Sequence, residues 1–65
     1  MNLNLGDMAE IVDMAKGLDD SNRSYTIFPG VIGLVVDISV ESVGLLIAQS
    51  IVYVPDRLLK KLNND

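Results

Sequence analysis

The chain has 65 residues, enough for one small domain, and it contains neither cysteine nor histidine. These absences exclude disulfides and thiolate chemistry, and they leave no imidazole for acid–base catalysis or for a typical zinc site. Nine acidic residues against five basic ones give a net charge of −4, which disfavours non-specific binding to nucleic acid because that binding needs clustered cations.

A short segment near the N-terminus, residues 8–13, fits two kinds of secondary structure. In a helix, Met8, Ile11 and Val12 would share one face, and Asp7 could serve as the N-cap. In a strand, Ile11 and Val12 would point to opposite sides. The local pattern slightly favours the helix and leaves the strand open.

The polar segment that follows, residues 16–28, is predicted to be mostly loop. Residues 16–24 read KGLDDSNRS, a composition typical of turns. Tyr25 to Phe28 is predicted to be a short extended edge. Pro29-Gly30 should close it with a type II turn, because proline presets φ and glycine accepts a positive φ.

The stretch from residue 31 to residue 54 is rich in valine and isoleucine and has no lysine or arginine. Alternation of side chains and two turn signals, Glu41-Ser42 and Gln49-Ser50, divide it into consecutive strands. The predicted strands cover residues 31–40, 43–48 and 51–54.

Two polar residues of the first of these strands, Asp37 and Ser39, favour solvent on their side. We therefore predict that the other side faces the core, so that Val35 points outward. In the next two strands, Leu46 and Tyr53 are predicted to point outward. The predicted inward residues are Ile32, Leu34, Val36, Ile38, Val43, Leu45, Ile47, Val52 and Val54.

The last strand of this group ends at Pro55, because proline has no N–H for a strand ladder. The tripeptide Pro55-Asp56-Arg57 suits a single 3₁₀ turn. Residues 58–62, which read LLKKL, are predicted to be either a short helix or a last closing strand.

Several short motifs punctuate this layout at spacings typical of a small barrel. They are Gly6-Asp7, Gly30 to Ile38, Val43 to Ile47, and Val52 to Pro55 followed by Leu58. The layout resembles the SH3-like barrel proteins of bacteriophages and cyanobacteria. The resemblance implies an all-β fold, a five-stranded SH3-like barrel over residues 1–65. Its strands would be 8–13, 31–40, 43–48, 51–54 and 58–62, with 16–28 as a long RT-like loop.

A competing fold is an amphipathic helix packed across a three-stranded antiparallel sheet. It would use the helical alternative for the segment near the N-terminus. The barrel is preferred because it pairs the strand edges that a bare three-stranded sheet would expose.

The sequence offers few groups for catalysis, and we predict no enzyme, no cofactor and no metal site. Its serines have no histidine to act as a base. Asp19-Asp20 could offer oxygen ligands to a cation, but the spacing lacks the alternating ligands of an EF-hand loop. A solvated loop is the favoured interpretation of this pair.

The apolar content, 49% of residues, is high for a chain with so little interior. We therefore predict a non-enzymatic protein-interaction module that self-associates or docks on a larger assembly. The candidate interaction residues are Tyr25, Phe28, Val35, Leu46 and Tyr53. For Tyr25 and Phe28, packing of the loop onto the barrel is the competing role.

The alternative function is a nucleic-acid-associated accessory protein of phage or bacterial type. Its candidate basic patch is Arg57, Lys60 and Lys61. The acidic total opposes this function, so nucleic acid is not the expected partner. Neither a signal peptide nor a membrane span is predicted, and the expected location is the cytoplasm of a bacterium or phage-infected host.

Overall fold

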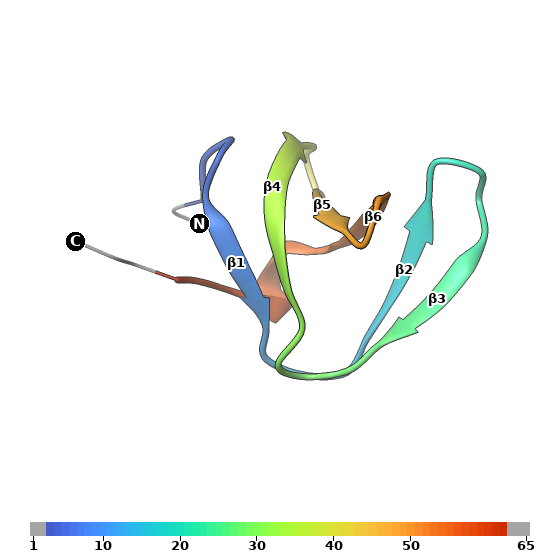
Figure 1. Ribbon diagram of the computed structural model, residues 1–65, viewed down its shortest axis with the longest axis horizontal. Helices are drawn as coiled ribbons and strands as arrows, with labels where there is room; N and C mark the ends of the chain where they lie inside the picture. Colours follow the sequence, from blue (N-terminus) through green and yellow to red (C-terminus); the bar gives the residue numbers. More distant parts are fainter. Residues whose placement is uncertain (1–2, 63–65) are drawn as a thin grey trace.

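A computed structural model describes residues 3–62, which form one antiparallel sheet with a single 3₁₀ turn (Figure 1). The elements are β1 (Met8–Ile11), β2 (Ala15–Asp19), β3 (Ser24–Ile27), β4 (Ile32–Ile38), β5 (Ser42–Ile47), β6 (Ser50–Pro55), η1 (Asp56–Leu58) and β7 (Leu59–Lys61). The strand order across the sheet is β3-β2-β6-β5-β4-β1-β7. The predicted all-β fold is confirmed, although the paired strands do not close into a ring and β3 and β7 form the two edges.

The ambiguous segment at residues 8–13 forms a strand over its first part. β1 pairs with β4 on one side and with β7 on the other. Its alternate residues Ala9 and Ile11 are fully buried, whereas Met8 is 41% exposed. The helical alternative is wrong, because burial follows a period of two and both strand edges are paired. The 3₁₀ turn predicted after Pro55 and the short last strand are confirmed as η1 and β7.

Residues 16–28, predicted as a long loop, belong mostly to a β-hairpin made by β2 and β3. Ala15, Gly17 and Asp19 face inward while the residues between them are exposed, so the polar composition is that of a half-solvated strand. The connecting loop is short. The N–H of Asn22 donates to the carbonyl oxygen of Asp19 across 3.0 Å, and Asn22 has a φ of 65°, as in a type I turn followed by a left-handed residue.

The predicted turn at Pro29-Gly30 is confirmed. The N–H of Val31 donates to the carbonyl oxygen of Phe28 across 3.4 Å, and Gly30 has the positive φ, 96°, that a type II turn requires. The same connection is held against β1. The N–H of Gly30 donates to the carbonyl oxygen of Ile11 across 2.8 Å, and the N–H of Ile11 donates to Val31 across 2.9 Å.

A β-bulge decides which residues of β4 face the core. Val35 pairs with Leu45, whereas Asp37 pairs with Gly44, so β4 has one extra residue between the two pairs. In a regular strand Val35 and Asp37 would share a face. The bulge instead places Val35 inside, at 1% exposure, and leaves Asp37 exposed.

The predicted inward face of β4 is therefore wrong before the bulge, where Ile32 is 47% exposed and Leu34 is half-buried on the outer face. After the bulge, Ile38 pairs with the buried Val43, as an inward residue would, but it is 44% exposed. Val36, between the two parts, is half-buried. The prediction used the polarity of Asp37 to assign the whole strand. The bulge breaks the alternation on which that assignment depended.

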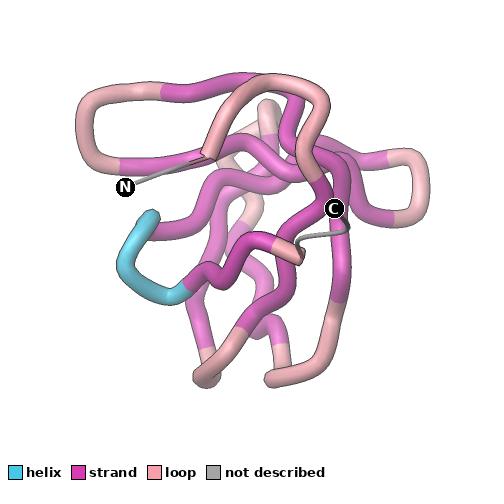
Figure 2. The backbone as a smooth tube through the Cα atoms, turned by 90° about the vertical axis from the view of Figure 1, so that its left-hand side faces the viewer, coloured by secondary structure: helices cyan, strands magenta, loops and turns pink. Residues whose placement is uncertain are grey.

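The core lies inside the curl of the sheet, as the wrapped course of the strands in Figure 2 shows. The inward predictions for β5 and β6 are confirmed: Val43, Leu45, Val52 and Val54 are buried, and Ile47 is half-buried and packs against the core. The buried hydrophobic residues are Leu3, Ala9, Ile11, Ala15, Ile27, Val35, Val43, Leu45, Val52 and Val54.

A two-residue turn at Ala48-Gln49 joins β5 to β6, one residue before the predicted reversal. Ile47 pairs with Ser50, and the two residues between them have φ values of 49° and 73°. Two positive φ values are typical of a type I′ hairpin turn, which favours Asn-Gly. A left-handed conformation costs a residue with a side chain roughly 1–2 kcal/mol, and glycine avoids this cost.

We expect Gln49→Gly to stabilise the protein by about 1 kcal/mol, because it relieves the left-handed strain at this position. A gain of that size raises Tm by roughly 4–8 °C in a domain of this length. Thermal denaturation followed by circular dichroism measures the shift. The control is Glu41→Gly, at an exposed loop position without a positive φ, which should lower Tm. Equal effects of the two substitutions would contradict the assignment of strain to the turn.

Candidate functional site

The five residues predicted to form an interaction surface lie in three different places. Tyr25 and Phe28 line a pocket beside β3. Leu46 and Tyr53 lie on the outer face of the sheet. Val35 is in the core, and the prediction that it points outward is wrong because the bulge in β4 turns it inward.

An apolar row crosses the outer face of four neighbouring strands. Met8 pairs with Leu34, Leu34 pairs with Leu46, and Leu46 pairs with Ile51. Directly paired residues on one face of a sheet are in contact range, so the four side chains lie side by side. We call Met8, Leu34, Leu46 and Ile51 the outer apolar row.

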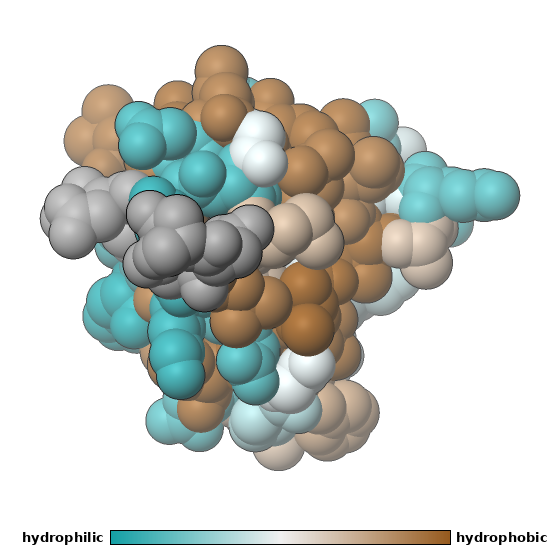
Figure 3. Space-filling view, turned by 60° about the vertical axis from the view of Figure 1, so that its left-hand side comes forward, coloured by the Kyte–Doolittle hydropathy of each residue, from teal (hydrophilic) through white to brown (hydrophobic). Residues whose placement is uncertain are grey.

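The outer apolar row is open to solvent. Met8 and Leu46 are 41% and 40% exposed, and Leu34 and Ile51 are half-buried. Ile32, which follows on the same face of β4, is 47% exposed. Figure 3 shows a broad apolar surface on one side of the molecule, next to a group of polar residues. The sequence predicted the exposure of Leu46, but it assigned Leu34, together with Ile32 on the same face, to the core.

Tyr53 is held in place by its neighbours on the outer face. Its hydroxyl donates to Oδ2 of Asp37 across 2.6 Å, and this bond raises the pKa of Tyr53 above its usual value. Tyr53 and Asp37 flank Gly44, and a Cβ on Gly44 would lie 3.0 Å from the tyrosine ring. The ring therefore covers Gly44, and Tyr53 serves the sheet itself.

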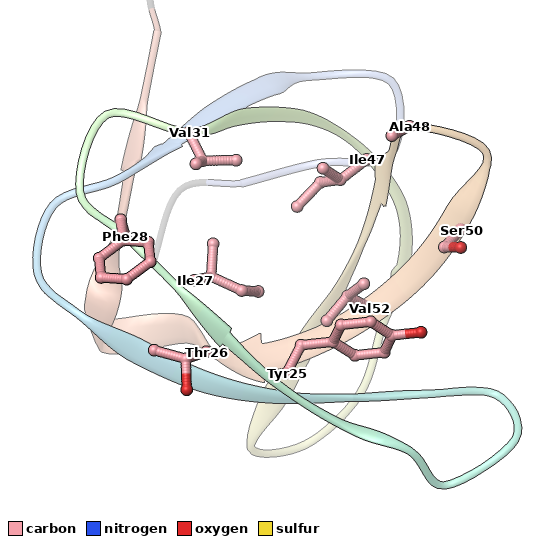
Figure 4. Close-up of a pocket in the computed structure, with 9 residues that line it drawn as sticks. All are labelled: Tyr25, Thr26, Ile27, Phe28, Val31, Ile47, Ala48, Ser50 and Val52. Atoms are coloured by element: carbon pink, nitrogen blue, oxygen red, sulfur yellow. The ribbon is translucent and has the colours of Figure 1, made fainter.

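A pocket of about 310 Å³ opens between β3 and the β5–β6 turn (Figure 4). β3 and the residue after it supply Tyr25 to Phe28 on one side, and the other side is lined by Val31, Ile47, Ala48, Ser50 and Val52. We call this the edge pocket. Its volume is at the lower end of the range of ligand sites, and none of its lining residues is charged.

The edge pocket runs along the border of β3. Four consecutive residues, Tyr25 to Phe28, line it, although alternate side chains of a strand point to opposite faces. Side chains from both faces of the strand can line the same pocket because the pocket follows the edge of the strand. Phe28 is 58% exposed there, whereas Ile27 belongs to the core. The predicted packing role of the aromatic pair therefore fails for Phe28, which remains open to solvent.

A buried carboxylate, Asp19, organises the tip of the β2–β3 hairpin. Its Oδ1 accepts the backbone N–H groups of Ser21, at 2.9 Å, and Arg23, at 2.8 Å. Its Oδ2 accepts the hydroxyl of Tyr25, at 3.0 Å, and Nε of Arg23, at 3.2 Å. The solvated-loop interpretation of Asp19-Asp20 is wrong for Asp19, whose side chain is 2% exposed, and fits the exposed Asp20.

These contacts favour the ionised form of the Asp19 carboxyl group. The N–H of Arg23 is the largest influence that lowers the pKa of Asp19 below 3.8, and it outweighs the opposing effect of burial. The bond from Tyr25 to Asp19 raises the pKa of the tyrosine. Tyr25 is thus fixed at the edge pocket by a network that the sequence spacing did not reveal.

The predicted basic patch is partly neutralised. Lys61 lies 3.7 Å from the carboxylate of Asp7, and Lys60 is directly opposite Glu10 in the pairing of β7 with β1. Arg57 is exposed in η1. The three cations do not form a continuous positive surface, because two of them face carboxylates.

Within residues 3–62, no group of three or more acidic side chains is placed to hold a metal ion. The same part of the chain contains no helix that is both long and apolar enough to cross a membrane. Comparison with protein-family models, with curated proteins and with solved structures finds no match for this chain. The function must therefore be inferred from the chain's own residues.

We expect the free energy of unfolding to fall on acidification, and Asp19 to account for part of the fall. Its folded-state pKa lies below its usual value of 3.8, so its stabilising effect is complete above that value and is lost as the pH falls through the folded pKa. Asp19→Asn should reduce the dependence on pH, as measured by urea denaturation between neutral pH and about pH 2. Asp20→Asn is the control and should follow the wild type. If the free energy of unfolding of Asp19→Asn depended on pH as steeply as that of the wild type, this role of Asp19 would be contradicted.

Proposed function

We propose that the protein is a non-enzymatic interaction module that docks on a larger protein assembly through the outer apolar row. The observation that carries the proposal is the pairing of Met8, Leu34, Leu46 and Ile51 across four strands on the outer face of the sheet, where Met8 and Leu46 are exposed. Monomeric proteins rarely expose large contiguous apolar surfaces unless the surface binds something.

The energetics favour covering this row. Complete burial of a leucine, isoleucine or methionine side chain contributes about 1.5–3 kcal/mol. Met8 and Leu46 leave about two fifths of their surface in water, and Leu34 and Ile51 are half-buried. A partner that covered the row would therefore recover part of this free energy from four adjacent side chains at once.

An SH3-like barrel plan is part of the proposal. It is supported by the order of elements: a first strand, a long hairpin, a three-stranded meander, a 3₁₀ turn and a short last strand. The hairpin of β2 and β3 would occupy the place of the long RT-like loop. The proposal takes no function from this plan, because one fold serves many functions.

The alternative of nucleic-acid binding is less well supported. Lys60 and Lys61 face Glu10 and Asp7, which reduces the local positive potential. The exposed aromatic residues are Tyr25 on β3 and Phe28 directly after it, whereas the lysines belong to β7 at the other end of the strand order. Single-strand binding needs aromatic groups along a positively charged groove, and lysines that face carboxylates do not supply such a groove.

We expect Leu46→Lys to weaken partner binding about tenfold or more while changing stability by about 1 kcal/mol or less, because the position is exposed and central in the row. A photo-reactive side chain at position 46 in the native cell would identify the partner. The affinity of that purified partner would then be measured for wild type and variant by isothermal titration calorimetry.

The matched control is position 40, since Val40 is 95% exposed at the β4–β5 loop and lies outside the row. Val40→Lys should leave the affinity unchanged, and a photo-reactive group there should not capture the same protein. The proposal would be wrong if position 46 captured no protein beyond those captured from position 40. An affinity that does not respond to Leu46→Lys would also contradict it.

A further inference from the structure

The free edge of β3 can accept another strand. β3 pairs with β2 on one side, and none of the described strands pairs with its other side. Along an antiparallel pair, residues alternate between those that direct N–H and C=O at the partner and those that direct them away. Asp19 and Arg23 are a hydrogen-bonded pair, with N–H to oxygen at 3.0 Å. The alternation therefore leaves the N–H and C=O of Thr26 facing away from β2.

The two edges of the sheet differ in charge. β7 carries Lys60 and Lys61, and lysines on an edge strand deter pairing with another chain. β3 reads Ser-Tyr-Thr-Ile and is followed by Phe28, without any charge. Ser24, Tyr25 and Thr26 are exposed. The β3 edge thus lacks the protection that β7 has.

We propose that β3 pairs antiparallel with β3 of a second copy of this chain, around a two-fold axis at Thr26. A two-fold interface requires a surface that is complementary to itself. The β3 edge meets this requirement, because Thr26 offers one free donor and one free acceptor in the same place. Two copies would therefore exchange both hydrogen bonds at the axis.

The register of this pairing places Phe28 opposite a small side chain. With Thr26 opposite Thr26, Phe28 of each copy falls opposite Ser24 of the other. The exposed ring of Phe28 would meet the smallest side chain of the edge, and cross-strand pairs of this kind stabilise a sheet. The added strand would also cover the mouth of the edge pocket, which follows the same border.

Charge favours a second copy over other strands. The edge pocket has no charged lining residue, so a partner strand with lysine or carboxylate groups there would lose hydration without compensation. The neutral edge of β3 in a second copy avoids this cost. This dimer does not use the outer apolar row, so its two outer faces stay free for the proposed docking function.

The test is sedimentation equilibrium of the full chain over a range of concentrations. Wild type should dimerise, and Thr26→Pro should raise the dimer dissociation constant at least tenfold, because proline removes the donor on the axis. Proline is tolerated on an edge where the N–H faces solvent, so the monomer should keep its circular dichroism spectrum. Thr26→Ser keeps the donor and should dimerise as the wild type does.

A second measurement uses the unaltered protein. Hydrogen exchange at the Thr26 amide should slow as the protein concentration rises, since the group is bonded in the dimer and free in the monomer. If Thr26→Pro does not fold, Thr26→Lys replaces it and should dissociate the dimer by placing two charges at the axis.

Three results would overturn the inference. They are a wild type that stays monomeric at all concentrations, a dimer that survives Thr26→Pro (or Thr26→Lys, where that variant replaces it), and a Thr26 amide whose exchange rate does not change with concentration. A dimer lost in Leu46→Lys but kept in Thr26→Pro would move self-association to the outer apolar row. The three overturning results leave the partner affinity at Leu46 unaffected, so the two proposals fail separately.

Discussion

A single sheet supplies nearly every residue of the core, so it has to curl until its inner face packs against itself. Strands near both ends of the strand order contribute to that interior: Ile27 from the edge strand β3 and Ile11 from β1, next to the other edge, are buried in the same cluster. Close approach is needed where β2 crosses β6, and Gly17 provides it, because a Cβ there would lie 2.5 Å from a methyl group of Val52. Because of this curl, only one face of each strand can point into the core. The apolar content of the chain exceeds what that inner face can hold, so some apolar side chains lie on the outer face.

The features predicted well from the sequence are those set by neighbouring residues. The Pro29-Gly30 turn, the end of β6 at Pro55 and the inward faces of β5 and β6 depend on local backbone geometry or on simple alternation. The bulge in β4 has no such signal, because Val35, Val36 and Asp37 read as ordinary strand residues. One extra residue there reversed the assignment of the first part of the strand, so that Leu34 of the outer apolar row was assigned to the core. Likewise, the polar segment at residues 16–28 was predicted as a loop although it contains strands. One of these strands, β2, pairs with β6, which is distant in the sequence.

The two proposed surfaces lie on different parts of the sheet and use different physics. The outer apolar row is a face, where side chains from several strands offer area to a partner. The β3 edge offers unpaired backbone groups, and its geometry depends on the Asp19 network that holds the hairpin tip and Tyr25. Pairing at the β3 edge would fix the register and orientation of the two copies, whereas the outer apolar row would supply the area buried against a partner. A two-fold dimer joined at β3 would present two copies of the row, which strengthens binding to an assembly with repeated sites.

The pairing of β1 with β7 has a consequence for how the molecule is made. The N–H of Leu62 donates to the carbonyl oxygen of Met8 across 2.9 Å, although nearly the whole described chain separates them. The hairpins β2–β3, β4–β5 and β5–β6 can form from adjacent segments, whereas β1 has no neighbour until β4 appears and stays half-paired until β7 does. Such distant closure slows folding. On the ribosome, β1 emerges before the other described strands and its second edge is paired only when β7 has emerged, so the nascent chain passes through a stage in which that edge is open to wrong partners.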